Sequence, residues 1–184
     1  MARLIIQFLF LFTLIIMLTA CPGPQKYPDE PQITFKQMII SDSTDLLSNQ
    51  VKKVKLIFYL IDGDGNIGLK EGDTTGIFHP DSLYYFNFFT TIFEIVDGDT
   101  VKTPDDKQRN FRIPYVEPQG QVKTLMADIF IDIEFAYPIN GSPPYDSIFF
   151  EFYIVDRDFN PSNLENSITI PLDTTGKFPD VVDE

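Results

Sequence analysis

Asp128-Ile129-Phe130-Ile131-Asp132-Ile133-Glu134-Phe135 decides the fold, because an apolar residue stands at every second position, with mostly charged residues between. A period of two is typical of a β-strand that lies with one face on a hydrophobic core. The same alternation occurs at residues 53–60 and 147–155. No stretch of the sequence has the period of 3.6 that an amphipathic helix requires. The chain is therefore expected to be all-β.

Further strands are expected at residues 33–40, 83–96, 100–102, 110–115 and 167–172. Residues 83–96 are apolar on both faces, which predicts a long central strand with a bulge. The pair Asp97-Gly98 is a strong signal for a two-residue hairpin turn, and Pro171 suits an edge strand. Together they predict a single antiparallel, immunoglobulin- or fibronectin-like β-sandwich of about seven strands at residues 33–172. A closed barrel is the main alternative.

Residues 1–20 are expected to be a lipoprotein signal peptide that is removed. Arg3 precedes an apolar run, and Leu18-Thr19-Ala20-Cys21 forms a lipobox at which signal peptidase II cuts. The run is shorter than the ~20 apolar residues that span a bilayer. Lipid chains on Cys21 would then anchor the chain to a membrane. Pro22, which follows the cysteine, favours the outer membrane.

The two ends of the mature chain have compositions of their own. Residues 21–32 comprise the acylated cysteine and a tether with four prolines, which favours a semi-rigid polyproline II spacer. Residues 173–184 are acidic and weakly patterned, so they are expected to form a frayed tail.

The charge of the chain limits its partners. It carries 27 acidic and 14 basic residues, a net charge of -13, and its pI is near 4.3. Such a surface repels nucleic acid and anionic lipid, so neither is an expected partner. Cys21 is the only cysteine. Its acylation leaves no thiol for a disulfide, for catalysis or for a metal site.

Two acidic loops predict a calcium site. Asp62, Asp64 and Asn66 stand at every second position with glycines between them, and Asp156 and Asp158 follow the strand expected to end at Val155. In an immunoglobulin-like sandwich these two loops lie at the same end. Calcium takes 6–8 oxygen ligands, and the five side chains supply oxygens. The competing interpretation is that Arg157 neutralises Asp62 or Asp64 through a bidentate ion pair.

Three motifs in order carry a family resemblance: residues 62–69 (DGDGNIGL), residues 111–114 (FRIP), and Asp156-Arg157 followed by Ser162-Asn163. In these the chain resembles short Bacteroidota lipoproteins of unknown function that contain an immunoglobulin-like domain. The resemblance covers residues 33–172, although Asp158 and Phe159 stand where small residues are expected. It implies a β-sandwich at an envelope surface and supplies no activity.

Tyr59, Phe130, Phe149 and Tyr153 fall on positions opposite the core pattern. If they gather on one sheet, they form a platform on which sugar rings or a protein partner could stack. The alternative is that a further strand, a loop or the tail covers them.

No catalytic constellation stands out. His79 is the only histidine and lies in an expected loop, so zinc sites that need several His or Cys ligands are excluded. The sequence therefore predicts a membrane-anchored, non-catalytic binding or recognition module for a glycan or a protein. A structural accessory subunit of an envelope complex is the alternative, and a glycan hydrolase is a weaker one.

Overall fold

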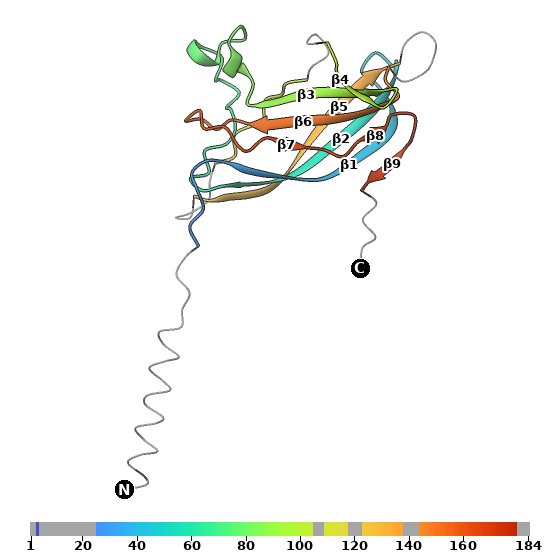
Figure 1. Cartoon of the computed structure of the whole chain (residues 1–184). Helices are drawn as coiled ribbons and strands as arrows, with labels where there is room; N and C mark the ends of the chain where they lie inside the picture. The colour runs from blue at the N-terminus through green and yellow to red at the C-terminus, as the bar shows by residue number, and fades with distance from the viewer. Residues whose placement is uncertain (1–2, 4–24, 105–108, 118–122, 138–143, 180–184) are drawn as a thin grey trace.

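The computed structural model describes residues 3, 25–104, 109–117, 123–137 and 144–179, and they form two antiparallel β-sheets packed face to face (Figure 1). The first sheet has the order β5-β2-β1-β9. Its strands are β1 (Gln32–Thr44), β2 (Gln50–Asp62), β5 (Leu125–Ala136) and β9 (Gly176–Phe178). No helix in this part of the chain is long and apolar enough to cross a membrane.

The second sheet has the order β4-β3-β6-β7, with β8 also paired to β6. Its strands are β3 (Phe88–Val96), β4 (Asp99–Lys102), β6 (Ser147–Ile154), β7 (Glu165–Asn166) and β8 (Ile170–Pro171). Two short 3-10 turns, η1 (Gly76–Phe78) and η2 (Leu83–Tyr85), lie in the long β2–β3 connection. The expected antiparallel β-sandwich is confirmed, and its two sheets follow the strand order of an immunoglobulin-like domain.

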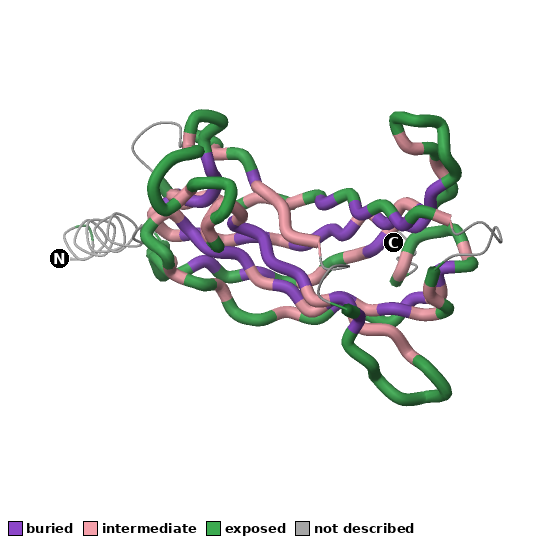
Figure 2. The backbone as a smooth tube through the Cα atoms, turned by 90° about the horizontal axis from the view of Figure 1, so that it is seen from above, coloured by how far each residue is buried: buried purple, intermediate pink, exposed green. Residues whose placement is uncertain are grey.

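The core lies between the sheets, where the inward residues of the alternating strands meet. The rings of Phe58, Phe88 and Phe152 are fully buried, with centroids 5.3 to 5.8 Å apart. Figure 2 shows that the buried residues lie along the strands and that the loops consist mostly of exposed residues. Burial of each such side chain stabilises the fold by roughly 1.5–3 kcal/mol, so the aromatic content of the chain supplies much of the core.

The β3–β4 hairpin forms where the sequence predicted it. Asp97 and Gly98 have φ angles of 54° and 90°, as a turn with two left-handed central residues requires. Pro171 is also at an edge, because β8 pairs with β6 alone and the partner of Pro171 is Ser147.

Three strand predictions were wrong in part. The strand expected at residues 167–172 is limited to Ile170–Pro171 (β8). The strand expected at residues 83–96 begins only at Phe88, because residues 83–85 form η2, and the register shift lies between Phe35 and Gln37 of β1 instead. Residues 110–115 form isolated bridges, Phe111 to Phe88 and Pro114 to Leu69, rather than a strand. In the latter two places a continuous backbone ladder is missing, although Ile113 is buried in the core while Leu83 is exposed.

The C-terminal prediction was also wrong in part. β9 pairs with β1, with Phe178 opposite Met38, so the sandwich continues beyond Leu172. The ammonium group of Lys52, whose side chain is almost fully buried, donates to the Thr174 carbonyl at 3.1 Å and holds this segment in place. Residues 180–184, the expected signal peptide apart from Arg3, and Cys21 lie outside the described residues.

Candidate functional site

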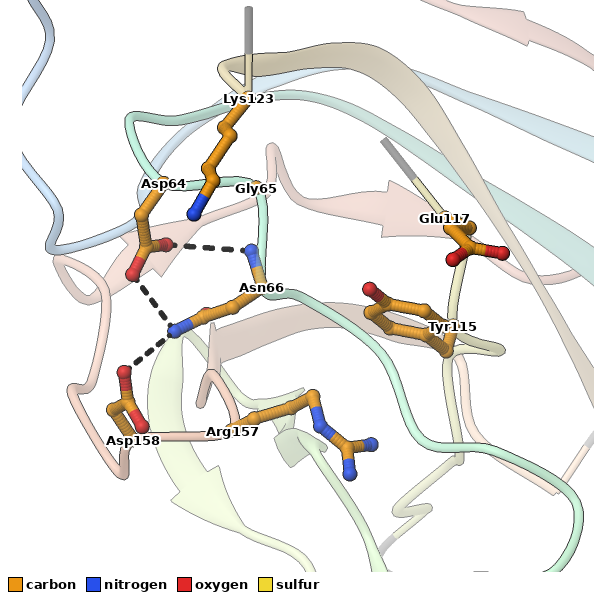
Figure 3. A pocket seen from close by; sticks show the side chains of 8 residues that line it. All are labelled: Asp64, Gly65, Asn66, Tyr115, Glu117, Lys123, Arg157 and Asp158. Atoms are coloured by element: carbon orange, nitrogen blue, oxygen red, sulfur yellow. Dashed lines mark hydrogen bonds between the residues drawn. The ribbon is translucent and has the colours of Figure 1, made fainter. Parts of the chain in front are cut away.

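A polar cavity of about 480 Å³ lies at the end of the sandwich where β2 and β6 finish (Figure 3). The β2–β3 and β6–β7 loops meet there, as the topology predicted. Residues from four described stretches of the chain line the cavity: Asp64, Gly65, Asn66, Tyr115, Glu117, Lys123, Arg157 and Asp158.

Asp62, the last residue of β2, fixes the start of the first acidic loop. Its side chain is fully buried, and Oδ2 accepts a hydrogen bond from the backbone N–H of Ile67 at 3.1 Å. Oδ1 is buried as well and has no hydrogen-bond partner among the described residues. Leaving a buried carboxylate oxygen unpaired costs free energy. A proton, a hydrogen-bond donor or a cation at Oδ1 would remove this cost.

Asp62 is unusually basic for a carboxyl group. Burial, followed by the charge of Asp64, raises the pKa of Asp62 from 3.8 to about 7, and the charge of Asp156 adds to the effect. Asp62 therefore keeps its proton to a higher pH than an ordinary carboxyl group, unless a cation offsets its burial and the charge of Asp64.

Asn66 joins the two acidic loops. Its Nδ2 donates to Oδ2 of Asp64 at 2.9 Å and to Oδ2 of Asp158 at 3.0 Å (Figure 3). The Oδ1 atom of Asn66 is buried and has no partner in the described parts of the chain. The structure therefore brings Asp62, Asp64, Asn66 and Asp158 together.

Asp156, the fifth expected metal ligand, instead organises its own loop. Oδ1 accepts from the N–H groups of Asp158 and Asn160 at 2.9 and 2.8 Å, and Oδ2 accepts from Nδ2 of Asn160 at 2.8 Å. Phe159 takes a left-handed φ of 67° inside this turn. Both oxygens of Asp156 are thus occupied by the loop that they shape.

Arg157 does not compensate Asp62 or Asp64, which corrects the competing interpretation. Its guanidinium lies 2.6 Å from Oδ2 of Asp73 and donates to the Gly68 carbonyl at 3.3 Å. The hydrogen bond from Arg157 lowers the pKa of Asp73 below 3.8. The Arg157–Asp73 pair ties the second loop to the β2–β3 connection and leaves the Asp62–Asp64 pair without that cation.

A ready-made metal cage is absent from the described ranges, where no three Asp, Glu, His or Cys side chains are arranged to hold an ion. What the loops offer is the Asp62–Asp64 carboxyl pair and the amide oxygen of Asn66. Calcium requires more oxygens than these three side chains supply, so water or a bound ligand would have to complete its coordination.

The residues of the 111–117 segment were missed as site residues. Arg112 donates to the carbonyls of Tyr85, Asp73 and Lys70 at 2.6, 3.0 and 3.1 Å. It thereby fixes the long connection beside which Tyr115 and Glu117 line the cavity. The FRIP motif marked this segment, but no pattern in the sequence indicated that Tyr115, Glu117 and Lys123 would face the acidic loops.

The outward aromatics do not form one platform. Tyr59 and Phe130 lie on strands of the first sheet, whereas Phe149 and Tyr153 lie on β6 of the second. Because the sheets pack face to face, their outward residues point to opposite sides of the molecule. The ring of Phe149 stacks on Phe93 at 4.9 Å and that of Tyr153 on Phe89 at 5.0 Å, whereas Phe130 is exposed.

His79 lies in the exposed loop between η1 and η2. Its Nδ1 accepts from the N–H of Asp81 at 3.2 Å and lies 3.5 Å from the Asp81 carboxylate, and both side chains are exposed. The pair is a local turn contact.

The N-terminal segment docks next to the cavity. The N–H of Gly63 donates to the Pro28 carbonyl at 2.9 Å, and a Cβ at position 63 would overlap the carbonyls of Pro28 and Tyr27. Only glycine fits this approach. The last part of the expected tether is therefore seated on the end of the domain that carries the cavity.

Comparison of the chain with protein-family models, with curated proteins and with solved structures finds no match. The function is consequently argued from the site.

Proposed function

We propose that this protein is a lipid-anchored, non-catalytic recognition module that binds a glycan in its loop-end cavity with the help of a calcium ion. The observation that carries the proposal is the convergence of Asp62, Asp64, Asn66 and Asp158, with two buried oxygens left unpaired, Oδ1 of Asp62 and Oδ1 of Asn66.

A cation is supported by the electrostatics of the Asp62–Asp64 pair. Without an ion, burial and the charge of Asp64 raise the pKa of Asp62 to about 7, so Asp62 holds a proton below that pH. A calcium ion would replace that proton and would bind the Oδ1 atoms that have no partner. Carboxylate and amide oxygens are the ligands that calcium prefers.

A glycan is supported by the chemistry of the cavity wall. Asp64, Asp158 and Glu117 present acceptors, while Lys123 and Arg157 present donors. Sugar hydroxyls donate and accept hydrogen bonds, so they match a wall of mixed polarity. Hydroxyl oxygens are also hard ligands that can fill the coordination positions left open on calcium.

The first test is a thermal melt of the full-length, detergent-solubilised protein in calcium and in chelator, followed by a glycan array under both conditions. A ligand that binds only the folded state stabilises it by about 2.7 kcal/mol at 100-fold excess over Kd. For a domain of this size the midpoint should rise by roughly 5–10 °C. Asp62→Asn and Asp64→Asn should reduce the rise, whereas the exposed, distant Asp99→Asn should not.

The two parts of the proposal fail separately. A melting midpoint that is the same in calcium and in chelator would contradict the calcium part of the proposal. Glycan binding that persists in chelator would keep the cavity as a sugar site and assign the Asp62–Asp64 pair to its proton alone. A glycan array that shows no binding in either condition would contradict the glycan part of the proposal.

A further inference from the structure

The free edge of β5 is the longest unpaired strand edge in the part of the chain that the structure describes. β5 has 12 residues and pairs with β2 on one side only. Alternate residues of an edge strand turn their N–H and C=O groups away from the sheet, where they can pair with another strand.

A groove of about 490 Å³ runs beside this edge. Phe111, Ile113 and Pro114 line one side, and Ile129, Phe130 and Ile131 of β5 line the other. Phe130 stands at the centre with 58% of its surface exposed. Exposed edges are ordinarily protected by charge or by cover, so a bare aromatic ring at mid-edge is unusual.

The charges around Phe130 specify what can pair with the edge. Asp128 and Asp132 flank it on the same face of β5. Away from the free edge, Lys36 of β1 pairs with Asp128 at 2.9 Å, and Lys53 of β2 pairs with Asp132 at 2.8 Å. The side chains of both carboxylates remain about two-fifths exposed, at 39% and 43%. An incoming strand would therefore meet a row of a carboxylate, an aromatic ring and a second carboxylate, those of Asp128, Phe130 and Asp132.

This pattern rejects a second copy of the chain. An antiparallel pairing of two β5 edges centred on Phe130 would place Asp128 of each copy opposite Asp132 of the other. Like charges directly opposite each other in a sheet are destabilising, and the net charge of -13 adds to the repulsion. Arg112, at the groove, donates to three carbonyls and does not neutralise the row.

We propose that the β5 edge binds an extended segment of another protein, in which two basic residues flank an apolar residue at alternate positions. The segment would add a strand to the first sheet by backbone hydrogen bonds, the mode known as β-augmentation. Its basic residues would extend the Lys–Asp pairs that β1 and β2 make with β5, and its central apolar residue would cover Phe130. This surface is separate from the loop-end cavity and does not depend on the glycan proposal.

The probe is a capped heptapeptide, Thr-Lys-Val-Ile-Val-Lys-Thr, with a counterpart in which both lysines are glutamate. Full-length protein in detergent is titrated with each peptide while hydrogen exchange is followed at the β5 amides. The lysine peptide should slow exchange at alternate amides of residues 127–133. It should bind about tenfold more tightly than the glutamate peptide, and added salt should reduce the difference.

Matched serine variants locate the contact. Phe130→Ser, at an exposed position, should weaken binding of the lysine peptide severalfold, whereas Phe149→Ser, on the opposite sheet, should leave it unchanged. Equal binding of both peptides would overturn the charge argument. Unchanged exchange in β5 at about 1 mM lysine peptide, or a wild-type dimer with protected β5 amides, would overturn the proposal as a whole.

Discussion

At the scale of single residues, Asp62 makes the stability of the metal-free protein depend on pH. Burial and Asp64 raise its pKa to about 7 in the folded state, against 3.8 as the ordinary value. Between these two pH values the folded protein holds a proton that the unfolded chain has released. The free energy of unfolding should therefore fall as pH rises from about 4 to about 7, and the loss should level off above that range.

Asp62→Asn isolates this contribution. The asparagine can still accept from the N–H of Ile67, and its amide can donate to Asp64, but it does not titrate. In chelator the wild type should lose on the order of 2 kcal/mol more than the variant between pH 4.5 and pH 7. Urea unfolding at several pH values measures both slopes. Parallel slopes would mean that Asp62 ionises normally.

At the scale of elements, Arg112 is one of two arginines from distant segments that hold the β2–β3 connection, the other being Arg157. Arg112 donates to three carbonyls of this connection, and its guanidinium lies 4.6 Å from the ring centroid of Tyr85. Hydrogen bonds to charged groups contribute about 1.5–3 kcal/mol each when both partners are retained. Arg112→Gln should destabilise the fold by about 2 kcal/mol.

Local opening distinguishes this effect from general destabilisation. Hydrogen exchange in Arg112→Gln should quicken most at residues 69–87, because the connection loses one of its two arginine anchors. Lys55→Gln removes an exposed cation whose nearest carboxylate is 3.9 Å away, and it should cost under about 0.5 kcal/mol. An exchange profile raised evenly over both sheets would show that Arg112 supports the whole sandwich instead.

The elements also show what the sequence can predict. Alternation identified β2, β5 and β6, because one face of each strand is buried and the other is solvated. It failed at residues 83–87 and 110–115, where the backbone forms a 3-10 turn, isolated bridges and bonds to a side chain: Asn87 accepts from the N–H of Ile113 at 2.6 Å and donates to its carbonyl. Such pairing leaves no regular alternation of apolar and polar residues, so it could not be predicted from the sequence.

Some contacts of the candidate site could likewise be predicted from the sequence, and others could not. The meeting of Asp64, Asn66 and Asp158 followed from the strand order, since the two loops share one end of a sandwich. The partner of Arg157 did not, because Asp73 lies in a connection whose path no local pattern determines. Tyr115 and Lys123 reach the cavity from irregular segments, so their position depends on tertiary packing alone.

At the scale of the whole molecule, the contact between Pro28 and Gly63 determines which end of the sandwich lies nearest to Cys21, the expected lipid anchor. Pro28 comes seven positions after Cys21, a span of at most about 25 Å when fully extended. The cavity lies beside Gly63, whereas the nine residues of β3 carry the β3–β4 hairpin about 30 Å away. Figure 1 shows the described N-terminal chain entering at the end opposite that hairpin. If Cys21 is acylated, the cavity should face the bilayer.

Energy transfer to headgroup-labelled lipid in proteoliposomes tests this orientation. Acylation consumes the only native thiol, so a dye can be placed on Glu117→Cys, at the cavity, or on Asp99→Cys, at the hairpin. Transfer should be clearly stronger from position 117, since a separation of tens of ångströms lies within the range of the method. Cys21→Ser should abolish transfer from both positions. Equal transfer in the acylated protein would mean that the domain does not hold the cavity toward the membrane, and a glycan reaching it would then have to come from the outer side.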